Sequence, residues 1–118
     1  MPMRWQDVDD WLGQLGVEGD ALVERTLRAA ADSPPDEDLS HATCEDTIAA
    51  AEVVACCAGA APDRVPDALR DHVERCGVPD DERLALALRA VARVGMQRDE
   101  HDEWLVDLEE RLSALATG

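Results

Sequence analysis

The sequence predicts an all-α protein of five or six short helices packed around a central alanine-rich helix. Apolar residues recur at the three- and four-residue spacing of amphipathic helices, and glycines and prolines separate these segments. Nineteen of the 118 residues are alanine, which has the highest helix propensity. No segment alternates between apolar and polar residues as a strand would. The length fits a single helical domain over residues 1–118.

Two helices are expected in the N-terminal third of the chain. The first runs from about residue 4 to 15, and Gly16 is expected to end it. Its apolar positions lie at helical spacing: Trp5, Val8, Trp11, Leu12 and Leu15. The second runs from about 19 to 31, before a proline-rich acidic loop over residues 33–38.

The central helix is expected over about residues 41–58, with Gly59 after its end. Nearly all its side chains from Ile48 onward are small and apolar. A helix that is apolar on most sides belongs in the middle of a fold. Glu52 is the exception, because it interrupts the apolar segment with a carboxylate.

Three further helices are expected in the C-terminal half. Pro66 suits the first position of a fourth helix that ends at Gly77. The fifth runs from residue 80 or 81 to about 94, where Gly95 weakens its end. The sixth runs from about 98 to 115, and its leucines recur at helical spacing.

The net charge of −16 arises from 27 acidic residues against 11 arginines, with no lysine. This balance argues against direct binding to nucleic acid or to an anionic membrane surface, since both need basic contacts. A negative field favours encounter with a basic protein partner, although an acidic surface more commonly serves solubility alone.

The compartment is predicted from the absence of a signal peptide and of an apolar segment long enough to span a bilayer. A cytoplasmic location is therefore expected. In that compartment Cys44, Cys56, Cys57 and Cys76 are expected to be free thiols. Adjacent helical side chains point apart, so Cys56 and Cys57 are not expected to bond to each other.

Several segments resemble a family of small bacterial proteins that carry a domain of unknown function. The resemblance rests on an early Asp10-Trp11-Leu12, the Ala-Ala-Glu-Val-Val-Ala segment over residues 50–55, and Trp104 in the last helix. Gly59, Pro62, Pro66 and the alanine- and leucine-rich helix over residues 84–94 extend it. The family's Gly-x-Gly-x-Phe-x-Asn-Asp opening is missing, and residues 3–7 stand there as Met-Arg-Trp-Gln-Asp. The resemblance implies an α-helical bacterial protein and transfers no catalytic residues.

Metal binding is the sharpest enzyme-like interpretation of the sequence. His41 and Cys44 stand three residues apart, and His72 and Cys76 stand four apart, so either pair could face one point from a helix. A structural zinc site commonly takes two such pairs. The spacing between the pairs matches no known zinc motif, and cysteine is also one of the most buried residue types.

Glu52 is the other candidate for chemistry. A buried carboxylate without a partner is costly, or has a raised pKa that suits acid–base catalysis. Exposure to solvent, or pairing with an arginine such as Arg89 or Arg93 across a helix interface, would remove that cost. No phosphate loop, nucleophile motif or cofactor motif accompanies Glu52, so neither an enzyme nor a cofactor is predicted.

A candidate interface lies in the acidic segment over residues 99–110, where seven of twelve residues are carboxylates. A solvated helix face is the alternative interpretation. Trp5, near the chain start, is a second candidate, because tryptophan is enriched at binding hot spots. The candidate interface residues are Trp5, Asp99, Glu100, Asp102 and Glu103.

Three functional hypotheses follow. The first is a non-enzymatic cytoplasmic protein that binds, and so neutralises, a basic protein partner. The second is a small metal-binding or catalytic protein that uses His41, Cys44, His72 and Cys76. The third is a homodimer in which a second copy completes a core that contains no phenylalanine or tyrosine.

Overall fold

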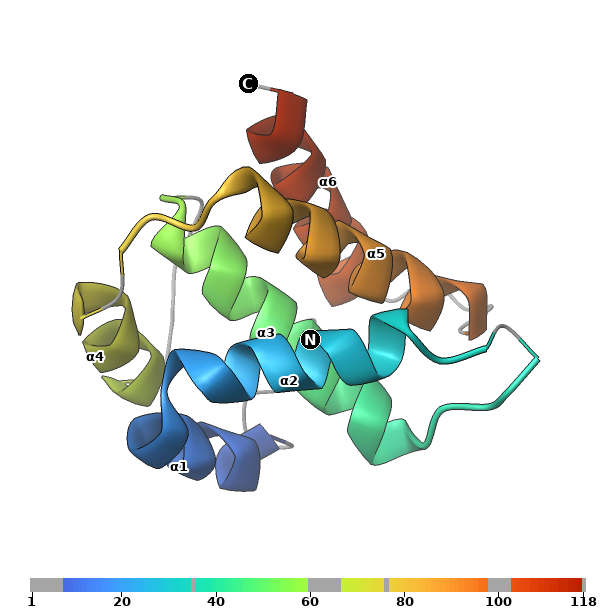
Figure 1. Ribbon diagram of the computed structural model, residues 1–118, viewed down its shortest axis with the longest axis horizontal. Coiled ribbons are helices and arrows are strands. Elements are labelled where there is room, and N and C mark those ends of the chain that lie inside the picture. The colour runs from blue at the N-terminus through green and yellow to red at the C-terminus, as the bar shows by residue number, and fades with distance from the viewer. Residues whose placement is uncertain (1–7, 35, 60–66, 76, 98–102, 118) are drawn as a thin grey trace.

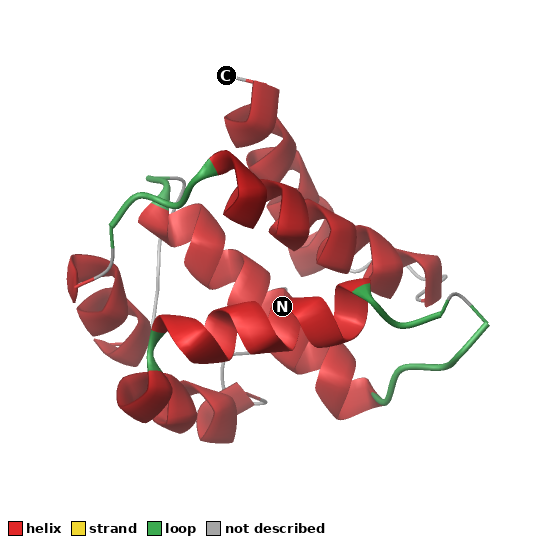
Figure 2. Ribbon diagram, viewed as in Figure 1, coloured by secondary structure: helices red, strands yellow, loops and turns green. Residues whose placement is uncertain are grey.

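The computed structural model describes residues 8–34, 36–59, 67–75, 77–97 and 103–117, and these form six α-helices (Figures 1 and 2). The helices are α1 (Asp9–Glu18), α2 (Asp20–Ala31), α3 (His41–Cys57), α4 (Asp67–Arg75), α5 (Asp81–Gln97) and α6 (Glu103–Thr117). No strand occurs in these segments, which confirms the predicted all-α class. None of the described helices is both long enough and apolar enough to cross a membrane.

The helices are arranged around α3. Both α2 and α5 pack against α3 and against each other, and α6 packs against α3 and α5. α1 and α4 pack together on the other side of the molecule, where α1 also contacts α2 (Figure 1). Each of the other helices except α1 therefore makes substantial contact with α3.

The predicted central position of α3 is confirmed. From Ile48 to Cys56 every side chain is buried, including three consecutive alanines that have no exposed surface. Small side chains let neighbouring helix backbones approach closely, and the leucines of the neighbouring helices supply the remaining core volume. The core thus reaches native packing without phenylalanine or tyrosine.

The apolar face predicted for the first helix is buried as expected, from Val8 through Trp11 and Leu12 to Leu15. The indole nitrogen of Trp11 donates a hydrogen bond to Thr26 Oγ1 of α2 at 3.0 Å. This bond satisfies the only polar atom of a large buried ring and ties α1 to α2.

Two predicted helix ends were wrong. Gly16 does not end α1, which continues to Glu18; the separating residue is Gly19, whose φ of +66° suits glycine. Gly95 likewise lies inside α5, which continues to Gln97. A Cβ built on Gly95 would lie 3.8 Å from Leu105 Cδ2, so this glycine faces the first turns of α6.

The loop between α2 and α3 is fastened by a buried arginine of α5. Arg93 donates from Nε to the carbonyl of Ser33 at 3.4 Å and from Nη2 to that of Pro34 at 2.9 Å, and it also bonds the carbonyl of Glu37. Ser40 then caps α3 by accepting a hydrogen bond from the backbone N–H of Thr43 at 3.1 Å.

Ala90→Leu is expected to lower the free energy of unfolding by about 1–3 kcal/mol, because Ala90 is fully buried and added methylenes overpack a close helix contact. Ala92→Leu, on an exposed position of the same helix, is the matched control and should change it by less than about 0.5 kcal/mol. Chemical denaturation of both variants measures the difference. Equal destabilisation would contradict the packing argument.

Candidate functional site

Glu52 forms the most buried charged contact in the described chain. Its side chain on α3 has no exposed surface, and Arg111 of α6 meets both carboxylate oxygens. Arg111 Nη1 lies 2.5 Å from Glu52 Oε2, and Nη2 lies 2.7 Å from Oε1. Arg111 Nε also donates to Asp107 Oδ2 at 2.8 Å. Two parallel bonds of this kind make a bidentate, charge-assisted pair.

The structure corrects the predicted partner of Glu52. An arginine across a helix interface does pair with it, but neither Arg89 nor Arg93 is that arginine. Arg89 Nη2 lies 3.4 Å from Oδ1 of Asp32, the residue that follows α2, and Arg93 holds the loop before α3. Arg89 and Arg93 belong to α5, whereas Glu52 is bound by an arginine of α6.

Cys56 completes this cluster but is not a reactive thiol. Its Sγ lies 3.8 Å from Glu52 Oε2, one helical turn away. Burial, and then the negative charge of Glu52, raise the pKa of Cys56 to about 12. Since the thiolate is the nucleophilic form, a thiol held neutral in this way is inert. The hydrogen bonds to Glu52 raise the pKa of Arg111, so the guanidinium stays charged, and the contact joins α3 to α6.

The prediction of four free thiols was wrong at Cys57. Cys44 and Cys56 are free and buried, whereas Cys57 is disulfide-bonded. The prediction rested on the expected compartment alone, and a compartment says nothing about which sulfurs the fold brings together. The argument that Cys56 and Cys57 do not bond to each other is confirmed.

The four proposed metal ligands are only partly described. Cys44 on α3 and His72 on α4 are both buried. The side chain of His41 and the whole of Cys76 lie outside the described residues. Within the described part of the chain, no three His, Cys, Asp or Glu side chains come close enough to hold a metal ion. The four-ligand site therefore stays a prediction.

His72 is a buried polar group in an unusual state. Its side chain is 4% exposed, and its Nε2 atom has no hydrogen-bond partner among the described residues. Burial lowers the pKa of His72, opposed by the carboxylate of Asp20 and assisted by the positive charges of Arg75 and Arg83. The imidazole is therefore held in its neutral form.

The candidate interface residues lie outside the described residues, except for the backbone of Glu103. Trp5, Asp99, Glu100 and Asp102 are not described, and Glu103 begins α6 with a side chain that is likewise not described. Their role in an interface remains a prediction.

The arginines of the described chain are engaged within the molecule. Beyond the residues already mentioned, Arg25 Nη1 lies 2.7 Å from Glu18 Oε1. Arg75 Nε donates to the carbonyl of Asp71 at 3.3 Å. The remaining ion pairs join Arg28 to Glu24, Arg70 to Asp67, and Arg83 to both Asp20 and Glu24. Arg75 and Arg93 thus bond backbone carbonyls, and the other arginines of the described chain lie beside a carboxylate.

Many carboxylates remain exposed without an arginine partner in the described chain. They lie on several helices, and examples are Asp9, Asp10, Asp81, Glu82, Glu109 and Glu110. α3 exposes no carboxylate, because Glu45 and Glu52 are buried and Asp46 is half-buried. Burial, and then the charge of Glu45, raise the pKa of Asp46. The negative charge therefore forms a coat on the outer helices.

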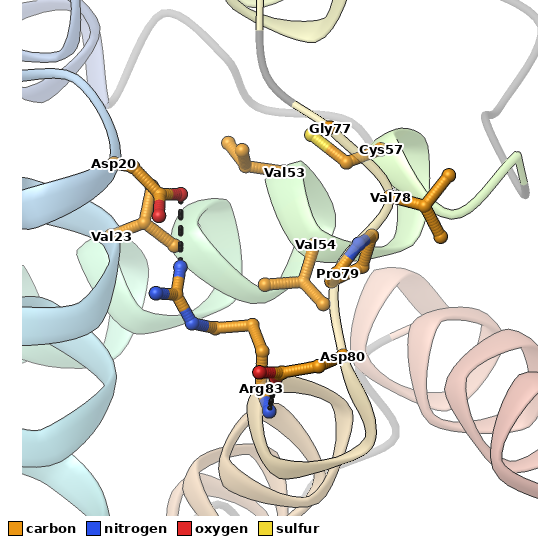
Figure 3. Close-up of a pocket in the computed structure, with 10 residues that line it drawn as sticks. All are labelled: Asp20, Val23, Val53, Val54, Cys57, Gly77, Val78, Pro79, Asp80 and Arg83. Carbon is orange, nitrogen blue, oxygen red and sulfur yellow. Dashed lines mark hydrogen bonds and ion pairs between the residues drawn. The ribbon is translucent and has the colours of Figure 1, made fainter.

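One cavity interrupts this acidic coat between α2, α3 and the segment that leads into α5 (Figure 3). It has a volume of about 290 Å³. Apolar side chains form much of its lining: Val23, Val53, Val54, Val78 and Pro79. Asp20, Asp80 and Arg83 supply the charged groups, and Arg83 Nη1 bonds Asp20 Oδ1 at 2.9 Å. No sequence pattern predicts this cavity, because its walls come from three segments that are distant in sequence.

A comparison with protein families matches residues 7–112 to the domain described as "Domain of unknown function (DUF4259)". The match covers most of the chain, and it agrees with the resemblance drawn from the sequence. No curated protein and no solved structure matches the chain.

Arg111→Ala is expected to lower the free energy of unfolding by about 3–5 kcal/mol, because the buried Glu52 carboxylate would lose both of its charge-assisted hydrogen bonds from the guanidinium. Arg28→Ala, which breaks an exposed ion pair, is the control and should cost less than about 1 kcal/mol. The double variant Glu52→Leu/Arg111→Met should recover most of the loss. Urea denaturation measures all three, and a loss at Arg111 no larger than at Arg28 would argue against the buried pair.

His72 should make the protein less stable as the pH falls. Its folded-state pKa lies below the ordinary 6.5, so above that pH neither state is protonated and the contribution to stability is complete. Below pH 6.5 the unfolded state binds the proton first, and stability is lost. The difference in unfolding free energy between wild type and His72→Leu should therefore not change with pH near pH 8. Below pH 6.5 the unfolding free energy of the wild type should fall relative to that of His72→Leu. Parallel pH profiles would exclude this role.

Proposed function

Since the chain belongs to the DUF4259 family, whose description assigns no function, we propose its function from its surface: it is a non-enzymatic module that binds a basic protein partner. The proposal includes a neutralising role, in which the acidic coat covers the basic surface of that partner. It also includes a bacterial source and a cytoplasmic location, as the sequence predicts; in that reducing compartment the disulfide at Cys57 would be an exception.

The observation that carries the proposal is the intramolecular use of the arginines. Arg83 and Arg89 pair with carboxylates of α2, Arg111 with Glu52, and Arg93 with backbone carbonyls. Exposed carboxylates such as Asp9, Asp10, Glu109 and Glu110 therefore have no arginine of the described chain as an ion-pair partner. Such a surface attracts a positively charged partner over distances up to about the Debye length, roughly 8–10 Å at moderate salt.

The described polar groups give little support to an enzymatic function. Cys56 is a neutral thiol, Glu52 is held by two hydrogen bonds from Arg111, and His72 is buried as the neutral imidazole. A binding function needs none of these groups to react. Direct nucleic-acid binding is not part of the proposal, because the exposed surplus charge has the wrong sign.

The proposed function predicts salt-sensitive capture of a basic protein. Immobilised protein should retain a partner of high isoelectric point from lysate of its source organism at about 50 mM salt and release it at about 500 mM. The partner is then purified, and its Kd is measured against salt concentration. Absent capture, or a Kd that does not respond to salt, would contradict the proposal.

Paired variants of equal net charge control for non-specific attraction. Asp9→Asn/Asp10→Asn, Asp81→Asn/Glu82→Gln and Glu109→Gln/Glu110→Gln each remove two exposed negative charges from a different helix. A specific binding face requires one pair to weaken the complex clearly more than the other two. Identical effects of all three would indicate only long-range attraction.

A further inference from the structure

We propose that the cavity between α2, α3 and residues 77–80 receives one basic side chain, a lysine or arginine, of the protein partner. This inference rests on the proposed function and assigns its anchoring point. Lysine and arginine side chains have an apolar stem and a cationic head, and the cavity offers a matching surface to each part.

The apolar lining suits the stem. Val23 from α2 and Val53 and Val54 from α3 lie at the cavity, and they belong to the buried core (Figure 3). Val78 also lines the cavity and is 82% exposed. Contact with a partner's methylene groups would remove this apolar surface from water.

Two carboxylates suit the cationic head. Asp20 uses Oδ1 to bond Arg83, and Asp80 uses Oδ1 to accept the backbone N–H of Arg83 at 2.8 Å. No hydrogen bond in the described chain occupies Oδ2 of either residue. An ammonium or guanidinium group can therefore be accepted without breaking an existing contact.

Arg83 does not make the cavity a site for an anion. Its guanidinium bonds Asp20 at 2.9 Å and lies 3.7 Å from Glu24, and its side chain is only 19% exposed. Asp20 and Asp80 outnumber it, which leaves the lining with a formal charge of −1. Exposed Asp81 and Glu82 continue the negative charge along the first turn of α5 and offset the partial positive charge of that helix end.

The test is an NMR titration of the full chain with two small probes at low ionic strength. Nα-acetyl-lysine methylamide has the stem and the charge, and Nα-acetyl-norleucine methylamide has a similar stem without the charge. The lysine probe should shift the backbone amide signals of Val53, Val54 and Val78, and the norleucine probe should shift them much less. Shifts that centre on Glu109 and Glu110 instead, or equal shifts with both probes, would overturn the proposal.

Asp80→Asn and Asp81→Asn form a matched pair of variants. Both remove one negative charge, but only Asp80 lines the cavity, and asparagine preserves the helix cap at that position. Asp80→Asn should weaken binding of the lysine probe by about threefold, whereas Asp81→Asn should leave it nearly unchanged. Val78→Ser, at an exposed position that folding does not depend on, should also weaken it. Equal effects at Asp80 and Asp81 would overturn the assignment.

The same variants separate this inference from the proposed function. If a basic partner is captured in a salt-sensitive manner but Asp80→Asn and Asp81→Asn weaken that complex equally, the cavity is not the anchor and the proposed function stands. If the lysine probe occupies the cavity but no basic partner is captured, the proposed function fails and the affinity of the cavity for a basic side chain remains.

Discussion

The small side chains of α3 are the constraint on which the other helix positions depend. Small side chains on a central helix let the backbones of neighbouring helices approach it closely, which suits a core without phenylalanine or tyrosine. Alanines 49, 50 and 51 allow this approach on several sides of α3 at once. Leucines on α2 and α6, such as Leu27 and Leu112, then fill the remaining space. The fold is thus built outward from a thin helix, and the larger side chains lie on its neighbours.

Glu52 is the one charged residue inside that apolar segment, and its contact with Arg111 gives α6 a defined position. Apolar contacts between two helices tolerate a small shift of one helix along the other. The two hydrogen bonds between Arg111 and Glu52, at 2.5 and 2.7 Å, would be broken by such a shift. Desolvation of both charges offsets much of their attraction, so this pair adds less to stability than to uniqueness of the packing. The neutral thiol of Cys56 beside it shows how strongly that environment suppresses further charge.

Features set by local sequence were predictable, and features set by tertiary contact were not. The helical spacing of Trp11, Leu12 and Leu15 gave the buried face of α1 directly, because periodicity reflects burial. The choice of Gly19 over Gly16 as the separator depends on a positive φ that sequence does not reveal. The partner of Glu52, the disulfide at Cys57 and the cavity each depend on which segments meet in space. Several arginines could have been the partner of Glu52, and helical periodicity does not indicate which of them lies beside it in the folded chain.

The surface charge and the interior are linked through the arginines. Arg93 and Arg111 are drawn inward, to backbone carbonyls and to Glu52, and Arg83 and Arg89 join α5 to α2. An arginine that pairs with a carboxylate uses one positive charge and one negative charge, so these contacts leave the net charge of −16 unchanged. They determine which exposed carboxylates, such as Asp9 and Asp10, have no arginine of the described chain beside them. At the cavity, charged and apolar groups lie side by side. Arg83 donates to Asp20 Oδ1, and Asp80 uses Oδ1 to accept the backbone N–H of Arg83. Both carboxylates line the cavity together with apolar side chains. Solubility alone requires charge but no such combination of charged and apolar groups, which is why the proposed anchoring point is placed at the cavity and not inferred from the net charge.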